Sequence, residues 1–469
     1  MTVADGSDAH TDLLRAYEKS VGVSGDGSEF VTAPWGNRLS AVLPVRRLAS
    51  GAVAVFASSV DRYRRSVGLD TTAWTLSPDR IAASFSGDRM YRENGVPVTA
   101  FAELSGFFEC ADGWVRTHAN YPHHRRALLQ AIGLGEAASV EAVRSRIGSL
   151  GSDVIERRCA RAGAIAVRLR TEQEWAEHEV GAAVASEPLV RSSLRSDTAL
   201  RSDFVGTQQY PLHGIRVLDL TRVIAGPVAS RALALLGADV LRIDPPDLPE
   251  IEWQHRENGQ GKRSALLDIG TAEGLNTARL LCAQADVLVS GYRPGAIENL
   301  GFLPSSFRPG IVCGSVSAWG DSARESNARQ NTAWLQRGFD SIVQAASGIA
   351  VIEGSEDDPG ALPAQALDHA SGYLLAACIV DALTATRMSG SGCDVSVSLA
   401  RTASWLTSAK DRTEHPEAAS IPGPNCTDTH GSTTTALPAL AVYSHYPFPA
   451  HPLGSHAPSF DDDRGPIST

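Results

Sequence analysis

The stretch of residues 212–301 constrains the fold most, because short apolar runs alternate there with amphipathic ones. The spacing predicts strands over residues 214–220, 239–243, 264–269 and 287–289, and helices that begin near Gly226 and Thr271. Strands that alternate with helices in this way form parallel sheets, whose ligands bind outside the carboxyl ends of the strands. The sequence therefore predicts an α/β fold with a doubly wound parallel sheet.

Composition and charge narrow the class of protein. At 469 residues, the chain is long enough for two or more domains, and its net charge of −11 argues against a nucleic-acid surface. The seven cysteines are scattered and form no Cys-x-x-Cys pair, which is typical of reduced thiols. No apolar run approaches the roughly 18 residues of a membrane span, and residues 1–11 lack the basic-then-apolar order of a signal peptide. We therefore expect a cytoplasmic protein without a membrane partner.

Four motifs in residues 212–301 point to one known family. They read G-I-R-V-L-D-L-T-R-V-I-A-G-P from Gly214, L-G-A-D-V-L-R-I-D-P-P from Leu236, G-K-R-S-A-L-L-D from Gly261, and R-P-G-A-I-E-N-L-G from Arg293. In this order they resemble the class III coenzyme A transferases of the CaiB/BaiF type, the family of formyl-CoA transferase, the carnitine CoA-transferases and the α-methylacyl-CoA racemases. The resemblance implies a Rossmann-like sheet with a smaller α+β domain. It also implies an acyl-CoA and a carboxylic acid as substrates, no tightly bound cofactor, and a homodimer.

The order of the segments differs from the family's usual order. The phrase F-F-E-C-A-D-G-W-V-R-T-H from Phe107, with a turn at Asp112-Gly113, resembles the family's small domain, which normally follows the catalytic half. The sequence therefore predicts four parts: an N-terminal extension (1–40), a degenerate second half (41–200), the catalytic domain (201–410) and an irregular C-terminal segment (411–469). The polar residues 192–209 are the predicted linker.

A short phrase occurs twice. Ala-Ser-Gly at residues 49–51 and again at 370–372 is followed each time by an apolar run that ends in arginine. This similarity favours an imperfect internal duplication, although two alanine-rich helices can also look alike by composition. If the repeat is real, Arg47 occupies the position of Asp368, so the first copy serves as scaffold or contacts an anionic group. We favour scaffold.

Asp368 is the predicted nucleophile. It lies in P-A-Q-A-L-D-H-A-S-G-Y from Pro363, which resembles the family segment that holds a nucleophilic aspartate. Without the resemblance, an aspartate three residues before Ser371 would be interpreted as a helix cap. Both roles are compatible, since a helix dipole favours a charged carboxylate at its N-terminus. By resemblance, Asp368 attacks an acyl-CoA thioester to form a mixed anhydride, which the released thiolate converts to an aspartyl-CoA thioester.

Two alternatives remain open at this stage. In the racemases a histidine precedes the aspartate of a Gly-His-Asp phrase, but here the matching phrase is Gly338-Phe339-Asp340, and a phenyl ring cannot take a proton. His369 follows Asp368 directly and would point about 100° away on a helix, so it is a poor substitute. The other alternative is a non-catalytic CoA-binding member, because the glycine-rich loop of formyl-CoA transferase has no clear counterpart.

The resemblance also assigns coenzyme A contacts. The matching positions are Val223, Ile224, Ala225, Leu267, Tyr292, Arg293 and Arg337. Lys262 and Arg263 are further candidates for phosphate, although a surface cation is more often only solvated. No Gly-x-Gly-x-x-Gly follows the first strand, which argues against a nicotinamide dehydrogenase. His118, His123 and His124 lack carboxylate or thiol neighbours at a suitable spacing, so we expect no metal.

Overall fold

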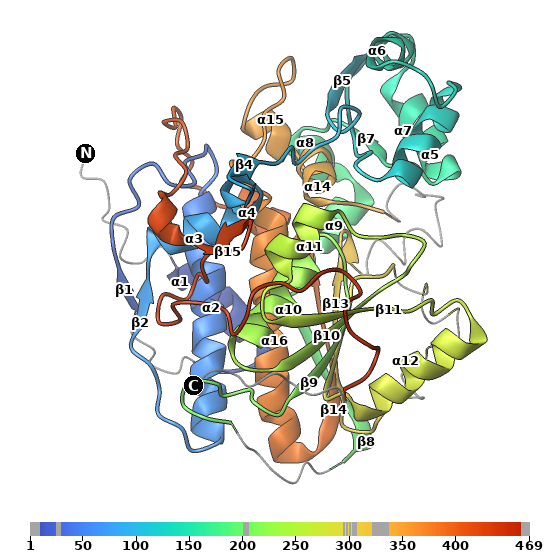
Figure 1. Ribbon diagram of the computed structural model, residues 1–469. Coiled ribbons are helices and arrows are strands. Elements are labelled where there is room, and N and C mark those ends of the chain that lie inside the picture. The colour runs from blue at the N-terminus through green and yellow to red at the C-terminus, as the bar shows by residue number, and fades with distance from the viewer. Residues whose placement is uncertain are drawn as a thin grey trace.

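The computed structural model describes residues 10–24, 30–199, 206–293, 296, 299, 302, 307–320 and 337–460. Within these residues, the strands form one sheet of seven strands, one of four, one of three and a parallel pair. The largest sheet runs through the middle of the molecule, and helices cover it (Figure 1).

The seven-stranded sheet is mainly parallel. In spatial order its strands are β11 (Lys262–Leu266), β10 (Asp239–Asp244), β9 (Arg216–Leu220), β12 (Val287–Ser290), β13 (Val312–Ser317), β14 (Ser391–Ser398) and β8 (Arg191–Thr198). The first six are parallel to one another, and β8 is antiparallel to β14 at the edge. The predicted α/β class with a mainly parallel sheet is therefore confirmed. The predicted strand 264–269 begins two residues earlier, so Lys262 and Arg263 lie inside β11.

Helices cover both faces of this sheet. Helices α10 (Ala225–Leu235) and α16 (Ala366–Ser389) pack on one face, and α12 (Ala272–Gln284) packs on the other. The same half of the chain also forms α11 (Glu252–Asn258), α14 (Asp340–Ala346), α15 (Ile349–Ile352) and α17 (Leu399–Thr407). Successive strand residues point to opposite faces. Val217 and Val240 accordingly join the core that contains α10 and α16, whereas Leu218 and Leu241 join the core that contains α12. Burial on both faces explains the nearly continuous apolar runs of these strands.

Helix α16 is the central helix of the larger core. By length and composition it could cross a membrane, but 94% of its most apolar window is buried inside the protein. A Cβ atom added at Gly372 would lie 2.6 Å from the carbonyl oxygen of Ala225, so a glycine is required where α10 crosses α16. This close crossing brings the N-terminal ends of the two helices together.

The N-terminal part of the chain packs against the same helix. It contains α1 (Thr11–Val21), β1 (Phe30–Thr32), α2 (Val45–Ser66), β2 (Trp74–Leu76), α3 (Pro78–Phe85) and α4 (Gly87–Met90). Figure 1 shows α2 beside α16, and the two helices share one core. Asp381 of α16 accepts hydrogen bonds from Tyr17 at 2.7 Å and from Arg62 at 2.8 and 2.7 Å. Segments on both sides of the predicted boundary at residue 200 therefore contribute to one core, and the division into four parts stays a prediction.

The predicted linker 192–209 is wrong in its first half. Residues Arg191–Thr198 form β8, which extends the main sheet. The strand is polar because it lies at the exposed edge, where Arg195 pairs with Asp197 and Asp394. An edge strand of this kind has the composition of a linker.

A smaller sheet has a core of its own. It consists of β5 (Phe107–Cys110), β6 (Gly113–Thr117) and β7 (Ala166–Arg168), with α5 (Pro122–Ile132), α6 (Val140–Gly148) and α7 (Ser152–Ala162) packed on it. The predicted pair of strands around Asp112-Gly113 is confirmed, although the turn consists of Ala111 and Asp112, and Gly113 is already the first residue of β6. After β7, α8 (Glu172–Glu177) begins with a capping box from Thr171, and α9 (Glu179–Ser186) leads to β8.

The C-terminal segment contains a hairpin that its composition did not predict. The hairpin is formed by β15 (Thr427–His430) and β16 (Thr433–Ala436), after the short 3₁₀ helix η5 (Pro424–Cys426). It pairs with β3 (Arg92–Glu93), which pairs with β4 (Val96–Pro97). Leu440 and Tyr443 then pack into the main core, as expected for residues near 437–446, and residues 461–469 lie outside the described part.

Candidate active site

A cavity of about 690 Å³ opens at the carboxyl ends of β9, β12 and β13. Its walls come from the turns that follow these strands and from residues near the N-terminus of α5. The lining includes Tyr121, His123, His124, Arg222, Val223, Ile224, Ala225, Tyr292, Arg293, Trp319, Arg337, Phe339 and Asp368. Strands β9 and β12 are neighbours from which the chain continues in opposite directions along the sheet, and such a switch point is where open parallel sheets bind ligands.

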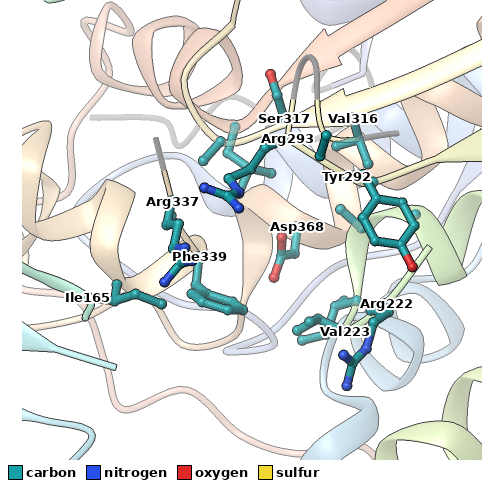
Figure 2. A pocket seen from close by; sticks show the side chains of 18 of the residues that line it. Ile165, Arg222, Val223, Tyr292, Arg293, Val316, Ser317, Arg337, Phe339 and Asp368 are labelled. Atoms are coloured by element: carbon teal, nitrogen blue, oxygen red, sulfur yellow. The ribbon is translucent and has the colours of Figure 1, made fainter. Parts of the chain in front are cut away.

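Asp368 faces this cavity from the first turn of α16 (Figure 2). The N-cap is Gln365, so the expected capping role of Asp368 is wrong. Only 6% of the residue is exposed, and its carboxylate accepts no hydrogen bond from any described residue. Burial, and after it the nearby Asp340 carboxyl, raise the pKa of Asp368 well above its ordinary value. The helix dipole therefore does not dominate, and the Asp368 carboxyl group is poorly solvated.

Asp340 accepts a hydrogen bond from the backbone of Asp368. It is the first residue of α14, and its Oδ2 accepts the backbone N–H of Asp368 at 3.0 Å. Its Oδ1 accepts a hydrogen bond from Gln344. Burial raises the pKa of Asp340 to about 6, although these hydrogen bonds oppose the rise. Sequence reasoning missed this role, although the signal was the aspartate of the Gly338-Phe339-Asp340 phrase.

The turn between β9 and α10 forms one wall of the cavity. It contains Val223, Ile224 and Ala225, three of the predicted coenzyme A contacts. Thr221 stabilises the start of the turn, because its backbone N–H donates to Asp219 at 2.9 Å. The buried Lys262 donates hydrogen bonds to the same segment: to the carbonyl oxygen of Pro227 at 2.8 Å, to Ser230 at 2.6 Å and to Asp219 at 3.2 Å.

The assignment of Lys262 and Arg263 to phosphate is therefore wrong. Burial lowers the pKa of Lys262 to about 8, and its ammonium group is enclosed by its three partners. Arg263 is buried against Asp239, with distances of 3.0 to 3.1 Å. Leu267, a predicted coenzyme A contact, lies just beyond β11 and packs against the core of α12, outside the lining of the cavity.

Three arginines line the cavity. In Figure 2, Arg293 and Arg337 lie on one side of Asp368, and Arg222 lies on the other. Burial lowers the pKa of Arg337, and the nearby Arg293 charge lowers it further. Two guanidinium groups this close favour an anion between them. The cavity is therefore suited to an anionic ligand, although the protein as a whole is acidic.

The histidines near the cavity are held as neutral side chains. Phe339 stacks on His118, with ring centroids 3.7 Å apart and planes at 3°. Burial lowers the pKa of His118 well below its usual value and that of His124 to about 3. His369 packs on Phe85 instead of facing the cavity. The described ranges contain no cluster of three or more His, Cys, Asp or Glu side chains that could hold a metal ion.

Comparison with known proteins assigns the chain to a family. A family model described as CoA-transferase family III matches residues 212–446, which is half of the chain. The chain belongs to CoA-transferase family III. The match contains β9 to β14, both Asp340 and Asp368, and the hairpin of β15 and β16.

Two curated relatives and two solved structures illustrate the similarity. A probable fatty acyl-CoA transferase of Mycobacterium tuberculosis is 30% identical over 190 residues, which cover 37% of this chain and 46% of the relative. A formyl-CoA:oxalate CoA-transferase of Escherichia coli is 32% identical over 205 residues, which cover 40% of this chain and 47% of the relative. The chain thus spans about half the length of the curated relatives it matches.

The two solved structures match similar fractions of this chain. A hypothetical protein of Mycobacterium tuberculosis has a TM-score of 0.38 and 28% identity, over 45% of this chain and 57% of that one. A CAIB/BAIF family protein of Brucella suis has a TM-score of 0.37 and 23% identity, over 49% of this chain and 66% of that one.

Proposed function

We propose that this protein transfers coenzyme A between an acyl-CoA and a carboxylic acid, with Asp368 as the nucleophile. The observation that carries the proposal is the position of Asp368. Its carboxylate lines a cavity at the carboxyl ends of β9, β12 and β13, together with six of the seven residues that the family resemblance assigns to coenzyme A. Membership of CoA-transferase family III supports the class of reaction.

The proposed reaction proceeds in four covalent steps. An Asp368 oxygen attacks the thioester carbonyl, and the thiolate of coenzyme A leaves, which gives a mixed anhydride. The thiolate then attacks the aspartyl carbonyl and releases the first carboxylic acid, which leaves an aspartyl-CoA thioester. The incoming carboxylate attacks that thioester and expels the thiolate, and the thiolate attacks the new acyl group and releases Asp368. No proton is consumed, so a poorly solvated carboxylate is the main requirement.

Cavity residues suit the binding of coenzyme A. The turn of Val223, Ile224 and Ala225 opens α10, where the first backbone N–H groups have no partner within the helix. Arg293 and Arg337 would bind phosphate groups, and Tyr292 would pack against the nucleotide or the pantetheine arm. Leu267 is not carried into this proposal, because it lies away from the cavity lining.

The strand order supports the doubly wound, Rossmann-like arrangement, because it places the first and fourth strands of the unit, β9 and β12, side by side at its centre. The sheet of β5 to β7, with its own core, is the proposed smaller α+β domain. We also propose a homodimer in the cytoplasm. The family resemblance supports the dimer, and the seven free thiols support a reducing compartment.

A transfer assay tests the function. Purified protein would be incubated with a labelled acyl-CoA and a panel of unlabelled carboxylic acids, and new acyl-CoA species would be separated by liquid chromatography and mass spectrometry. The proposal predicts a new thioester with at least one acid. Coenzyme A binding without any transfer would instead identify a non-catalytic member of the family. Deuterium incorporation at the α-carbon without transfer would identify racemase chemistry.

A further inference from the structure

Val223, in the wall of the cavity, has a strained backbone. Its φ angle is 71°, in the left-handed region that β-branched residues rarely adopt. Strain of this kind persists only where the surroundings hold the residue in place, and it is most common at functional sites. The conformation of Val223 therefore depends on the side chains around it.

Two buried side chains hold Val223 from both ends of its backbone. The carboxylate oxygen Oε2 of Glu250 accepts the N–H of Val223 at 2.8 Å. The amide nitrogen Nδ2 of Asn258 donates to the carbonyl oxygen of Val223 at 3.2 Å. Glu250 is 5% exposed and Asn258 is 1% exposed, so neither hydrogen bond competes freely with water.

Glu250 also reaches the opposite wall of the cavity. Its Oε1 accepts the hydroxyl of Tyr121 at 2.5 Å, and Tyr121 is the N-cap residue of α5. The guanidinium group of Arg222 lies over the Tyr121 ring, 5.1 Å from its centroid. One carboxylate therefore joins the turn after β9 to the segment that carries His123 and His124.

The charge of Glu250 is compensated inside the protein. Arg242 donates to its Oε2 at 3.2 Å and also pairs with Asp244 at 2.8 and 2.9 Å. Burial alone raises the pKa of Glu250, but Arg242 and Arg222 outweigh this effect and the net pKa is lowered. Glu250 is therefore an ionised, fixed acceptor, and it does not itself line the cavity.

We propose that Glu250 is a positioning residue that holds Val223 in its left-handed conformation and ties the turn to Tyr121, so that the cavity is preformed for its ligand. The inference rests on the proposed binding of coenzyme A to this cavity. The left-handed Val223 directs the chain into α10 and sets the direction of the N–H groups of Ile224 and Ala225. Without Glu250, Val223 relaxes toward negative φ and these N–H groups turn away from the ligand.

A double-mutant cycle separates this role from a general structural one. Glycine adopts positive φ without strain, so Val223→Gly needs no holding by Glu250. Glu250→Ala removes both acceptor oxygens, whereas glutamine would keep an oxygen that accepts the N–H of Val223. Glu250→Ala should weaken coenzyme A binding at least tenfold, and Val223→Gly should weaken it by less than about threefold. Once Val223 is glycine, adding Glu250→Ala should cost less than about threefold more. Glu252→Ala is the control, because this exposed residue pairs only with Arg256 among the described residues and should leave binding unchanged.

Two readouts are measured for all four variants. The first is the dissociation constant of coenzyme A by titration calorimetry, and the second is deuterium uptake by the peptide that contains Val223, without ligand. Faster uptake in Glu250→Ala but equal uptake in Val223→Gly with and without Glu250→Ala supports the positioning role. If the variants show this uptake pattern but the wild type binds no coenzyme A, the proposed function fails and the positioning role stands. If Glu250→Ala has the same effect on uptake in both backgrounds, the positioning role is wrong, whatever the binding.

Discussion

Helices α2 and α16 have similar N-terminal geometry but different residues at their first turns. Their N-cap residues have nearly the same backbone angles, with φ −76° and ψ 60° at Pro44 and φ −74° and ψ 63° at Gln365. Each helix then has a glycine at which a second helix crosses closely. A Cβ atom at Gly51 would lie 2.7 Å from Leu13 of α1, just as Gly372 is crowded by α10. These features support the predicted internal repeat.

The third helical residue of each copy differs in charge and surroundings. Arg47 is partly exposed and forms ion pairs with Asp12 and Asp411, so its charge is neutralised at the surface. Asp368 is buried, and the neighbouring carboxyl of Asp340 repels it. The comparison teaches that a helix start becomes a candidate reactive site when its carboxyl group faces a cavity and has no ion-pair partner among the described residues. The first copy meets neither condition, so we continue to predict that it serves as scaffold.

The largest expected effect is on the transfer rate, when asparagine replaces the third helical residue of α16 or, as a comparison, of α2. Asp368→Asn should lower the transfer rate by at least about 10³-fold, because the attacking oxygen is lost. Arg47→Asn should change it by less than about twofold, since Arg47 is not part of the cavity lining. Steady-state transfer rates of both variants provide the measurement. An equal loss of transfer rate in both variants would contradict the proposal that only α16 carries the reactive residue.

A smaller effect is expected from the cationic wall of the cavity. Arg337→Ala should weaken coenzyme A binding by about tenfold, because it removes a guanidinium group that lines the cavity and that we propose binds phosphate. Arg337→Lys should lose less, since the charge remains. The matched control is Arg412→Ala, which breaks an exposed pair with Glu172 and should leave the dissociation constant unchanged. An unaltered constant in Arg337→Ala would remove this arginine from the binding site.

The pH dependence tests the pair of carboxyl groups. Transfer requires ionised Asp368, so the rate should fall as the pH falls through its raised pKa. Asp340→Asn removes the neighbouring negative charge, which should shift this acid limb to lower pH, while the amide oxygen of the new side chain still accepts the N–H of Asp368. The pH profile of kcat checks the direction. A shift to higher pH would show that Asp340 lowers the pKa of Asp368.

Stability should respond to pH through the same pair. The folded-state pKa of Asp340 is about 6 and its ordinary value is 3.8, so the folded protein binds this proton more tightly than the unfolded chain. Its contribution to stability is therefore complete below the lower value and is lost as the pH rises toward the higher one. Asp340→Asn should gain stability relative to the wild type across this range, on the order of 1 kcal/mol. Urea unfolding at several pH values gives the difference, and a constant difference would contradict the raised pKa.

The smallest effect should come from the ion pairs of the first copy. Arg47→Ala removes contacts with Asp12 and Asp411, whose side chains are 52% and 55% exposed. Such exposed pairs contribute little, so the free energy of unfolding should fall by about 0.5–1 kcal/mol, and by less at high salt. Chemical denaturation at two salt concentrations measures the change. A loss above about 2 kcal/mol would show that Arg47 is integral to the core.

Strands β9, β10 and β12 could be predicted, because both of their faces are buried and their apolar runs are nearly continuous. The edge strand β8 could not, since its exposed polar residues have the composition of a linker. The surroundings of Lys262 and Arg263 could not be predicted from the local sequence either. Both are cations in the sequence, but their buried partners Asp219 and Asp239 come from other strands and are not visible in the local pattern.

The residues of the candidate site that lie in a sequence motif could be predicted. The residues that are linked only by contacts between distant segments could not. The phrase around Asp368 located the cavity-facing carboxylate, and the turn after β9 located three further lining residues. The link from Val223 through Glu250 to Tyr121 joins three segments that have no shared motif. The positive φ of Val223 gave no sequence signal at all, because glycine or asparagine is the residue usually expected there.

Oxygen transfer to residue 368 tests the central claim most directly. When a carboxylic acid labelled with ¹⁸O in both oxygens attacks the aspartyl-CoA thioester, one labelled oxygen becomes the bridge of the anhydride and stays on Asp368 after the thiolate removes the acyl group. Mass spectrometry of the protease-digested protein should therefore find ¹⁸O in the peptide that contains Asp368, and only when an acyl-CoA is also present. Transfer of coenzyme A with no ¹⁸O in that peptide would contradict the account.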